Sequence, residues 1–319
     1  MKRTSLALAL CLTLAACSPK SEAPQEPAQQ TAAPAETAQA PAGSFSIGTL
    51  SAIALRDGGF DFPNDNKIFG VGKTPEDVAA VLTAAGLPAD KLSVSIHPLL
   101  VKSADRVLLF DTGAGTNFGP AGGQLTQSLA DAGVEATSIT DVFISHAHGD
   151  HIGGLLNAEG APAFPNATVH IGAADWELLK GLDAETAAAV GAPNHAALVT
   201  ALTPKIDAFA PGADLIPGVV KAMDFHGHTP GHSGYLIGSG DSTLLYIGDS
   251  LHHSIISVQK PDWTVAFDLD APAGQKNRID VLTRSAESGQ RIYAVHFPYP
   301  GVGKFERRGD SFVWVLETL

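Results

Sequence analysis

Cysteine is nearly absent from this sequence. Its two cysteines, Cys11 and Cys17, both lie at the very start of the 319-residue chain. The rest of the chain therefore contains neither a disulfide nor a thiolate metal ligand. Any metal ion in the folded part has to be held by histidine, aspartate or glutamate, the other side chains that bind divalent cations well.

Positive charge is also scarce. The chain has 20 Lys and Arg against 33 Asp and Glu, a formal net charge of −13, and no run of basic residues. Proteins that bind nucleic acid use clustered positive charge to hold the phosphates, so we predict that nucleic acid is not a partner. Hydrophobic residues make up 45% of the chain, enough for the core of one long domain or two short ones.

The N-terminus is predicted to be a targeting signal. A basic start at residues 2–3 is followed by an apolar stretch from Leu6 to Ala16, which is too short to remain as a membrane-spanning helix. The stretch ends in Leu-Ala-Ala-Cys17, which resembles the lipobox of bacterial lipoproteins, where the cysteine is lipidated and becomes the new N-terminus. We predict residues 1–17 as a lipoprotein signal peptide; an ordinary cleaved signal peptide is the alternative.

The residues that follow are predicted to form a tether. Residues 18–43 are rich in Ala, Pro, Gln and Glu and contain no large apolar side chain, so they cannot offset the entropy lost on ordering. Ser18, directly after Cys17, is similar to the signal that sorts lipoproteins to the outer membrane. We therefore predict a protein of the bacterial cell envelope, held by its lipid at the outer membrane and facing the periplasm, with a catalytic domain at 44–319.

From Phe45 onward, short apolar runs alternate with glycine-containing breaks. The runs with the length and composition of β-strands are residues 45–55, 92–101, 106–110, 141–145, 168–171, 219–225, 235–237, 244–247, 292–295 and 312–316. Thr74-Pro75 starts a helix that ends at Gly86. Leu125 and Leu129 share the face of a second helix, and Ile279 and Leu282 that of a third. Strand pairs with helices between them predict an α/β fold of two sheets packed face to face, with helices outside.

The motif that carries the chemistry lies near the middle of the chain. It reads Ser-His146-Ala-His148-Gly-Asp150-His151, directly after a strand-like run. Neutral imidazole and carboxylate are suitable ligands for Zn²⁺ and similar cations. Because alternate positions at a strand end point in different directions, His146 and His148 are predicted to bind one ion, and Asp150 and His151 a second. Solvated loop histidines are the alternative reading of this motif.

This motif resembles that of the metallo-β-lactamase superfamily, and the other motifs of the superfamily occur in order. Asp111 in Leu-Phe-Asp111-Thr-Gly matches an acid that orients the metal loop, and His232 in Thr-Pro-Gly-His232 matches a ligand of the first metal. Asp249 in Tyr-Ile-Gly-Asp249 matches a carboxylate that bridges both ions. His296 in Val-His296-Phe-Pro matches a ligand of the second metal.

The third motif contains competing histidines. His226 and His228 precede His232 closely and are rivals for its role as a metal ligand. We prefer His232 because it ends the Thr-Pro-Gly-His signature of the superfamily. His252 and His253, just after the fourth motif, are candidates either for a supporting role or for the surface.

The resemblance covers residues 45–319 and implies both fold and chemistry. The implied fold is an αββα sandwich of two mixed β-sheets flanked by helices. The implied cofactors are two divalent metal ions, zinc by default, with iron, manganese or cobalt as alternatives. Such ions share a bridging hydroxide that attacks a carbonyl or phosphoryl centre. Asp150 and Asp111 are therefore candidate catalytic residues as well.

Within the superfamily, the chain is most similar to the branch of methyl parathion hydrolase, lactonases and arylesterases. The similarity rests on short stretches in the same order, among them Phe118-Gly-Pro-Ala, Phe164-Pro-Asn-Ala, Asp214-Leu-Ile-Pro-Gly, residues 226–232 and His296-Phe-Pro-Tyr-Pro-Gly. It implies a neutral, fairly hydrophobic small-molecule substrate, with aryl esters and lactones ahead of phosphotriesters such as methyl parathion. An Ala-rich segment at 181–204, where that branch has aromatic pocket residues, disfavours efficient phosphotriester hydrolysis.

Other branches and functions fit less well. β-Lactamases have Cys or no ligand where this chain has Asp249, and RNA-processing enzymes use basic residues, whereas no Lys or Arg lies between Asp141 and Lys180. A β-lactamase-like hydrolase, an iron-dependent redox enzyme similar to sulfur dioxygenases and a non-catalytic metal-binding lipoprotein remain as alternatives. The oligomeric state is left open, with a dimer as one option.

Aromatic residues are the candidates for substrate binding. Phe118, Trp176 and Phe297 are predicted to line the pocket, with Trp263 and Phe267 as further candidates. Packing in the hydrophobic core is the alternative for each of them.

The lipobox generates a first testable prediction. Replacing Cys17→Ser removes the thiol that would carry the lipid, so the variant should be released from membranes or remain unprocessed. Fractionation of cells, followed by mass determination of the product, measures both. A variant that stays in the membrane fraction as fully matured protein would show that the lipoprotein prediction is wrong.

Overall fold

The computed structural model describes residues 41–239 and 242–319. The predicted signal peptide with Cys17 and the predicted tether as far as residue 40 lie outside this part of the chain. No helix in the described part reaches the length and hydropathy that crossing a membrane requires.

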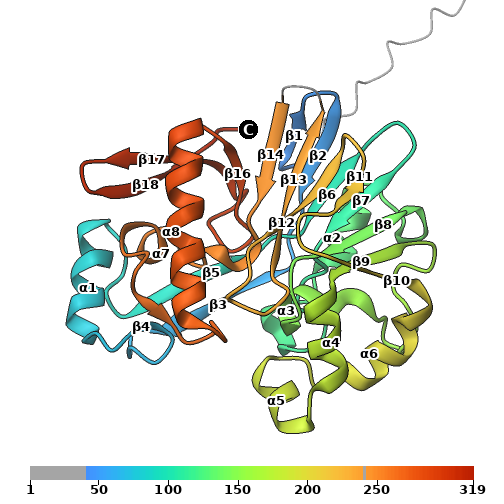
Figure 1. Cartoon of the computed structure of the whole chain (residues 1–319), viewed down its shortest axis with the longest axis horizontal. Coiled ribbons are helices and arrows are strands. Elements are labelled where there is room, and N and C mark those ends of the chain that lie inside the picture. Colours follow the sequence, from blue (N-terminus) through green and yellow to red (C-terminus); the bar gives the residue numbers. More distant parts are fainter. Residues whose placement is uncertain (1–40, 240–241) are drawn as a thin grey trace, which may run out of the picture. The chain divides into compact units, whose positions relative to one another are not determined.

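Two seven-stranded mixed sheets form the centre of the described domain (Figure 1). The first sheet has the order β1-β2-β6-β7-β8-β9-β10 and is parallel from β7 to β10. The second has the order β11-β12-β13-β14-β16-β17-β18, in which β14 and β16 are the parallel pair. The strands of the first sheet are β1 (Ser44–Ile47), β2 (Leu50–Ala54), β6 (Leu99–Lys102), β7 (Val107–Phe110), β8 (Asp141–Ile144), β9 (Thr168–Gly172) and β10 (Ile206–Phe209). Those of the second are β11 (Asp214–Ile216), β12 (Val220–Asp224), β13 (Ser233–Ser239), β14 (Ser242–Tyr246), β16 (Arg291–Tyr293), β17 (Val302–Arg308) and β18 (Ser311–Leu316).

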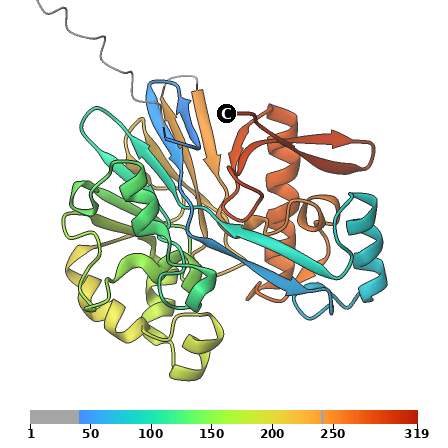
Figure 2. The same ribbon diagram turned by 180° about the vertical axis from the view of Figure 1, so that it is seen from behind.

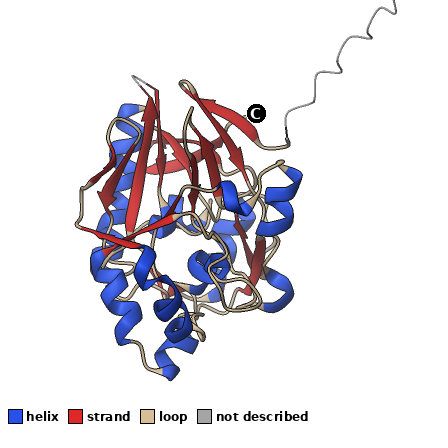
Figure 3. Cartoon of the chain, turned by 90° about the vertical axis from the view of Figure 1, so that its right-hand side faces the viewer, coloured by secondary structure: helices blue, strands red, loops and turns tan. Residues whose placement is uncertain are grey.

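Helices cover the outer face of each sheet, so the domain has four layers (Figure 3). On the first sheet lie α2 (Leu125–Asp131), α4 (Ala173–Gly181) and α6 (His195–Leu202), and on the second lies α8 (Ala271–Ser288). Shorter or peripheral helices are α1 (Pro75–Ala84), α3 (Gly149–Ile152), α5 (Ala184–Ala189) and α7 (Ile256–Gln259). Single 3₁₀ turns are η1 (Gly119–Ala121), η2 (Ala136–Ser138), η3 (Gly153–Leu155), η4 (Thr203–Lys205) and η5 (Gly248–Ser250). The predicted αββα sandwich is confirmed.

Aliphatic side chains and a cluster of aromatic rings fill the space between the two sheets. Phe110 and Phe143 of the first sheet stack at a centroid distance of 4.8 Å. Tyr235, Tyr246 and Tyr293 of the second sheet are fully buried against the same cluster. Their hydroxyls all have acceptors; that of Tyr235, for example, donates to the carbonyl of Ile144 at 2.5 Å. The core therefore joins the two sheets through hydrogen bonds as well as apolar contact, close to where β8 ends.

A two-stranded ribbon of β3 (Gly58–Pro63) and β5 (Lys91–Ile96) stands apart from both sheets (Figure 2). With α1 and the short pair β4 (Phe69–Val71) and β15 (Thr264–Val265) it encloses a separate apolar cluster. The sequence predicted one strand over 92–101. The structure divides this run into β5 and β6 at Pro98, which has no N–H to donate to a strand ladder.

The predicted helices differ from the observed ones in one detail of packing. α1 has the predicted cap, because the Thr74 side chain accepts from the Asp77 N–H while Asp77 bonds back to Thr74. In α8, however, Ile279 is exposed, and the buried face carries Arg278 together with Val281 and Leu282. An ion pair between Arg278 and Asp268 at 2.8 Å explains why a charged side chain faces inward.

Two of the three aromatic residues predicted to bind substrate are core residues instead. Trp176 lies on the inner side of α4, is 7% exposed and packs in the cluster under the first sheet. Phe297 is fully buried, with Trp314 edge-on at 5.1 Å. Both rings fill the interior of helix–sheet layers, so the prediction that they contact substrate is wrong.

The position of Trp176 generates the second prediction. Trp176→Ala should lower the free energy of unfolding by about 3–5 kcal/mol, the usual effect of deleting a large buried ring, and leave KM nearly unchanged. Thermal or denaturant unfolding and steady-state kinetics measure the two effects. Phe118→Ala, which truncates a half-buried ring, is the matched control and should destabilise the protein less. A variant that unfolds like the parent but has a raised KM would contradict this prediction and show that Trp176 contacts the substrate.

Candidate metal centre

The predicted metal motif forms the turn that follows β8. Its residues run from Ser145 to His148 and continue into α3. Gly149 permits this course, because a Cβ at that position would lie 1.8 Å from the carbonyl oxygen of Gly191. The turn is held from outside by Asp175, which accepts the Ala147 N–H at 2.9 Å. A buried strand therefore delivers four ionisable side chains to one point.

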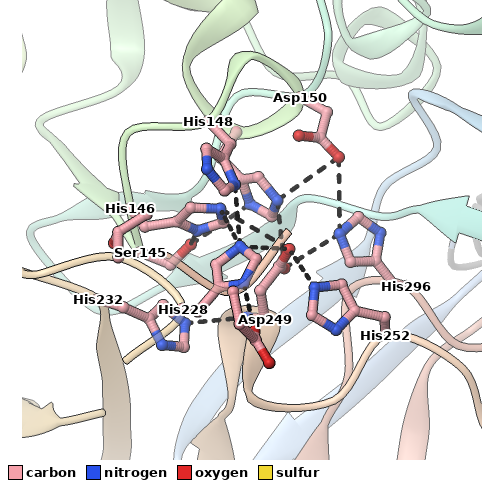
Figure 4. Close-up of polar contacts among 12 residues, drawn as sticks. Ser145, His146, His148, Asp150, His228, His232, Asp249, His252 and His296 are labelled. Atoms are coloured by element: carbon pink, nitrogen blue, oxygen red, sulfur yellow. Dashed lines mark hydrogen bonds and ion pairs between the residues drawn. The ribbon is translucent and has the colours of Figure 1, made fainter. Parts of the chain in front are cut away.

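A first group of side chains meets around His228 (Figure 4). The Nε2 atom of His228 lies 2.9 Å from Nδ1 of His148 and 3.2 Å from Nε2 of His146. One ligand atom from each of these three histidines and one from Asp249 lie within 4.8 Å of one another, and all four residues are buried. Three imidazoles and a carboxylate at this spacing suit a divalent cation such as Zn²⁺.

A second group lies on the other side of Asp249. It consists of Asp150, His151 and His296, whose ligand atoms also lie within 4.8 Å of one another. Oδ2 of Asp150 is 3.6 Å from Nε2 of both histidines. The structure thus separates His146 and His148 from Asp150 and His151 in the way the sequence predicts.

Asp249 faces both groups with different oxygens. Its Oδ1 lies 3.0 Å from Nε2 of His296 and 3.2 Å from Nε2 of His151. Its Oδ2 lies 3.3 Å from Nε2 of His228 and 3.7 Å from Nε2 of His146. A carboxylate placed in this way can bind one ion with each oxygen, which supports the predicted bridging role.

The rings are oriented by acceptors behind them. Nδ1 of His151 faces Oδ2 of Asp111 at 2.7 Å, Nδ1 of His228 faces Oδ1 of Asp268 at 3.0 Å, and Nδ1 of His296 faces the carbonyl of Ser95 at 2.7 Å. Acceptors at these distances place the proton on Nδ1 and direct the Nε2 lone pair toward the centre. Such outer hydrogen bonds are typical of metal-binding histidines.

The buried atoms at the centre are short of donors. His151 Nε2 and Asp249 Oδ1 face each other, yet neither has a hydrogen-bond partner among residues 41–239 and 242–319. Burying polar atoms without partners is unfavourable, and a carboxylate oxygen that faces an imidazole nitrogen calls for a positive charge between them, either a proton or a metal ion. The donor set and its geometry therefore fit divalent metal ions.

The electrostatics of the cluster agree with this fit. Burial, with the charge of His228 second, lowers the pKa of His148 to about 3, so its ring is neutral, as a ligand requires. Burial also lowers the pKa of His151, but the carboxylates of Asp249, Asp150 and Asp111 outweigh it and hold this pKa well above its usual range. Burial alone would raise the pKa of Asp249, but the surrounding histidines, His296 first, outweigh burial and hold this pKa well below its usual range. The second group is thus a strongly negative environment.

Asp111 supports the metal loop from beneath, as the sequence predicts. Its Oδ1 accepts the Ser145 N–H, and its Oδ2 accepts from the hydroxyls of Ser145 and Tyr246, each at 2.7 Å, besides contacting His151. Asp111 is buried and faces none of the inner ligand atoms except through His151. Asp111 is therefore a positioning residue. It acts through Ser145 and His151 and not as a catalytic residue, as which it was also a candidate.

The preference for His232 over His228 is wrong. Nδ1 of His232 donates to the carbonyl of Phe225 at 2.8 Å, and its Nε2 accepts the Asp249 N–H at 3.0 Å. Both nitrogens are used by the backbone, so His232 holds Asp249 in place instead of joining the first group. Gly248 allows this contact, since a Cβ there would lie 2.6 Å from Nε2 of His232. The third rival, His226, is exposed and pairs with Asp224.

Several supporting residues were not predicted from the sequence. Asp175 joins the two histidine loops, because it accepts from Ala147, from the Thr229 hydroxyl at 2.7 Å and from the Gly231 N–H at 2.6 Å. Asp268 and Arg278 form a buried pair behind His228. A charged residue in the apolar face of a predicted helix was the available signal for Arg278. Asp175 had none, because an acid in the first turn of a helix is ordinary.

A pocket of about 380 Å³ opens over the metal-ligand groups. Aromatic and aliphatic side chains form most of its wall, and His148, Asp150, Asp249, His252 and His296 form the polar part. Of the predicted aromatics, Phe118 and Phe267 line it, while Trp176, Trp263 and Phe297 do not. The other lining residues are Phe60, Phe62, Ile68, Phe69, Val94, Ala188, Ala189, Val190, Gly191, Ala266 and Leu269.

His252 is the polar residue of the pocket that the sequence left undecided. It is buried, and its Nε2 lies 3.3 Å from Oδ2 of Asp249. Neither ring nitrogen has a hydrogen-bond partner among the described residues. Its neighbour His253 instead accepts the N–H groups of Ile255 and Ile256 through Nδ1, which gives it a structural role.

Comparison with known proteins identifies a family and several proteins to which this chain is similar. The family model described as "Metallo-beta-lactamase superfamily" matches residues 94–280, more than half of the chain. Ribonuclease Z of Salinibacter ruber (strain DSM 13855 / M31) is 37% identical over 79 residues, 25% of this chain and 21% of that protein. Ribonuclease Z of Rippkaea orientalis (strain PCC 8801 / RF-1) is 36% identical over 74 residues, 23% and 21% of the two chains. The chain thus spans about a fifth of the length of these curated relatives.

Solved structures match over much more of the chain. AidC, a dizinc quorum-quenching lactonase in complex with a product, superimposes with a TM-score of 0.80 at 27% identity and covers 86% of this chain and 97% of its own. Hydrolase AbOPH of the β-lactamase superfamily superimposes with a TM-score of 0.76 at 24% identity and covers 88% and 99%. The second likeness shows the fold alone.

The two neighbouring histidines generate the third prediction. His228→Ala should remove about one bound metal ion per chain, because it deletes an inner nitrogen of the first group. His232→Ala should keep two ions and weaken their binding by about 10–100-fold at most, as is usual for a supporting residue. Elemental analysis after dialysis and chelator competition give both numbers. His226→Ala is the matched control and should bind as the parent does; loss of an ion in His232→Ala alone would restore the original assignment.

Proposed function

The chain belongs to the metallo-beta-lactamase superfamily, and on this premise we propose that it is a dinuclear metal-dependent hydrolase of neutral lactones or esters. The observation that carries the proposal is the position of Asp249 between two groups of ligand atoms at the floor of an apolar pocket. Divalent ions bound there would supply an activated water and polarise the carbonyl of the substrate. Zinc is the proposed metal, since AidC, the solved structure 27% identical in sequence, is described as dizinc.

The protein's own side chains prepare the site for this reaction. Asp111, Asp268 and the carbonyl of Ser95 hold three histidine rings with Nε2 toward the centre, so little reorganisation is needed when the ions bind. Asp150 is the least buried of the ligand candidates, with a side chain 17% exposed. It is positioned to move a proton between the pocket and the leaving oxygen of the substrate.

His252 offers a polar contact to the substrate. Its uncommitted nitrogens lie in the wall of the pocket beside Asp249. A substrate or product oxygen can therefore bond to this ring without displacing an existing hydrogen bond. Together with Asp150, His252 makes the polar end of a site whose remaining wall is apolar.

The wall of the pocket supports a neutral, hydrophobic substrate. Phe60, Phe62 and Phe118 come from the β3–β5 ribbon and η1, and Phe267 comes from the segment before α8. No Lys or Arg is among the residues that line the pocket. An anionic substrate gains no ion pair there, whereas a flat ring or an acyl chain gains apolar contact. The lactonase description of AidC favours a lactone; phosphotriesters are the second substrate class.

The Ala-rich segment forms one side of this pocket. Ala188, Ala189, Val190 and Gly191 line it beside the metal loop, where the Val190 carbonyl accepts the Gly149 N–H at 2.9 Å. Side chains this small leave room for a bulky or branched group but provide no ring for an aromatic substrate to stack on. Lactones with a flexible acyl group are therefore proposed ahead of aryl phosphotriesters.

The proposal includes a location in the cell, and two alternative functions can be distinguished from it by experiment. We propose that the enzyme acts in the cell envelope, anchored through Cys17. An iron-dependent redox enzyme would show iron and a visible spectrum after purification without chelators. A non-catalytic metal-binding lipoprotein would bind two ions but hydrolyse nothing. The short match to ribonuclease Z makes RNA a further compound to include in an activity screen.

Substrate preference is the fourth prediction. For metal-loaded protein, kcat/KM on a neutral lactone or aryl ester should exceed that on a carboxylate-bearing β-lactam by at least about a hundredfold, roughly 2.7 kcal/mol of transition-state binding. The physical reason is that the pocket provides apolar contact and no cation. A screen of lactones, aryl esters, phosphotriesters, β-lactams and RNA measures the ranking.

A variant of the pocket tests the cause of this preference. Phe118→Ala should reduce it mainly through a raised KM, because it removes binding area and no reacting group. Trp176→Ala, which lies outside the pocket, is the control for loss of an aromatic ring. A screen in which β-lactams or RNA rank first would overturn the substrate class while leaving the metal centre intact.

A further inference from the structure

A second pocket, of about 360 Å³, lies away from the metal-ligand groups and shares none of its lining residues with the first pocket. It is bounded by the start of the β3–β5 ribbon, by η1 and by the residue that precedes α2. Its lining residues are Arg56, Gly58, Gly59, His97, Pro120, Ala121 and Gln124. Neither the superfamily match nor the metal centre accounts for its polar side chains.

His97 is the unusual residue of this pocket. It is 3% exposed, and neither of its ring nitrogens has a hydrogen-bond partner among the described residues. The ring is held edge-on to Tyr299 at a centroid distance of 5.1 Å. A buried polar ring with two free nitrogens is unfavourable unless something in the pocket bonds to it.

The ionisation of His97 defines what it can bind. Burial, followed by the charges of Arg56 and His296, lowers its pKa to about 3. At neutral pH the ring is therefore uncharged and offers one N–H donor and one acceptor nitrogen. It contributes a hydrogen bond and no charge.

The charge of the pocket comes from Arg56. Its guanidinium lies over the ring of Tyr299, with Cζ 3.4 Å from the centroid, and no described carboxylate forms an ion pair with it. The nearest acid in sequence, Asp57, is committed elsewhere, because its oxygens accept the N–H groups of Ala114, Gly123 and Leu125. The positive charge of Arg56 is thus left without a counter-charge, in a pocket that also contains the unpaired ring nitrogens of His97.

We propose that this pocket binds a small monocarboxylate, held by the Arg56 guanidinium with His97 and the Gln124 amide as hydrogen-bond partners. A planar guanidinium matches the two oxygens of a carboxylate. A single cation balances one negative charge, and the pocket has no second Lys or Arg, which disfavours a phosphate dianion. Gln124 is exposed, and its side-chain amide has no partner among the described residues.

The backbone of His97, at the edge of this pocket, is hydrogen-bonded to the residue that precedes His296. The N–H of His97 donates to the carbonyl of Val295 at 3.0 Å, and the Ser95 carbonyl contacts Nδ1 of the adjacent His296. A carboxylate bound at His97 would therefore lie two residues along the chain from the Ser95 carbonyl that orients His296. The binding itself depends on neither the metal ions nor the proposed hydrolysis.

Binding can be followed at His97 itself. The full chain with its metals, labelled with ¹⁵N in histidine, is titrated with sodium acetate or sodium butyrate against sodium chloride at constant ionic strength. The His97 ring signals, assigned by their loss in His97→Gln, should shift saturably with a Kd on the order of 1 mM. Arg56→Gln should weaken binding at least about tenfold, as expected for loss of a charge-assisted hydrogen bond.

Two controls separate a built site from general charge effects. Arg284→Gln removes an exposed arginine of α8 outside the pocket and should leave the titration unchanged. Gln124→Ala, at an exposed position, should weaken binding and keeps the test open if Arg56→Gln fails to fold. Equal shifts with chloride, equal weakening by Arg284→Gln, tighter binding of phosphate or no shift at His97 would each overturn the proposal. A failed lactonase screen would not affect it.

Discussion

Histidine nitrogens and carboxylate oxygens converge on one buried point in this protein, more of them than hydrogen bonds among the described residues can satisfy. The surrounding structure holds these atoms in place. The histidines on both sides of Asp249 would relax if their rings could turn. They are prevented by acceptors fixed behind them, such as Asp111 behind His151 and Asp268 behind His228. Those acids are fixed in turn, Asp111 by Ser145 and Tyr246 and Asp268 by Arg278. A divalent cation is the natural partner of such a cluster.

The two-sheet architecture explains how one chain brings this cluster together. The first sheet supplies Asp111 and the 145–151 turn at the ends of its parallel strands, and the second supplies Asp249 after β14. Hydrogen bonds cross between the sheets at the same level, from Tyr235 to the end of β8 and from Tyr246 to Asp111. The geometry of the site therefore depends on the packing of the sheets, because a shift of either sheet would move the 145–151 turn away from Asp249.

The strand pattern and the resemblance to the superfamily predicted the fold class. Most of the side chains that the structure brings together were also predicted, and a dense run such as 146–151 keeps its residues next to one another through the backbone alone. The preference for His232 over His228 was wrong, since both histidines lie in one short turn and only the direction of each ring decides which one faces the first group. Trp176 and Phe297 were placed in the pocket because composition does not show which side of a layer an aromatic ring faces. The ribbon residues Phe60 and Phe62 were missed, because contact between distant segments leaves no local pattern.

The β3–β5 ribbon and α5 provide much of the pocket wall, yet the histidines of both ligand groups lie on other segments. During evolution, the apolar wall of the pocket and the metal-ligand groups can therefore change independently of each other. Side-chain substitutions on the ribbon or in the Ala-rich helix can accumulate without removing a ligand candidate, because the contact of the ribbon with the cluster, from Ser95 to His296, is made by a backbone carbonyl. A lineage carrying this scaffold can thus change the shape of its pocket in small steps, each of which retains the metal-ligand groups. The same separation makes the ribbon and α5 the natural segments to randomise in directed evolution.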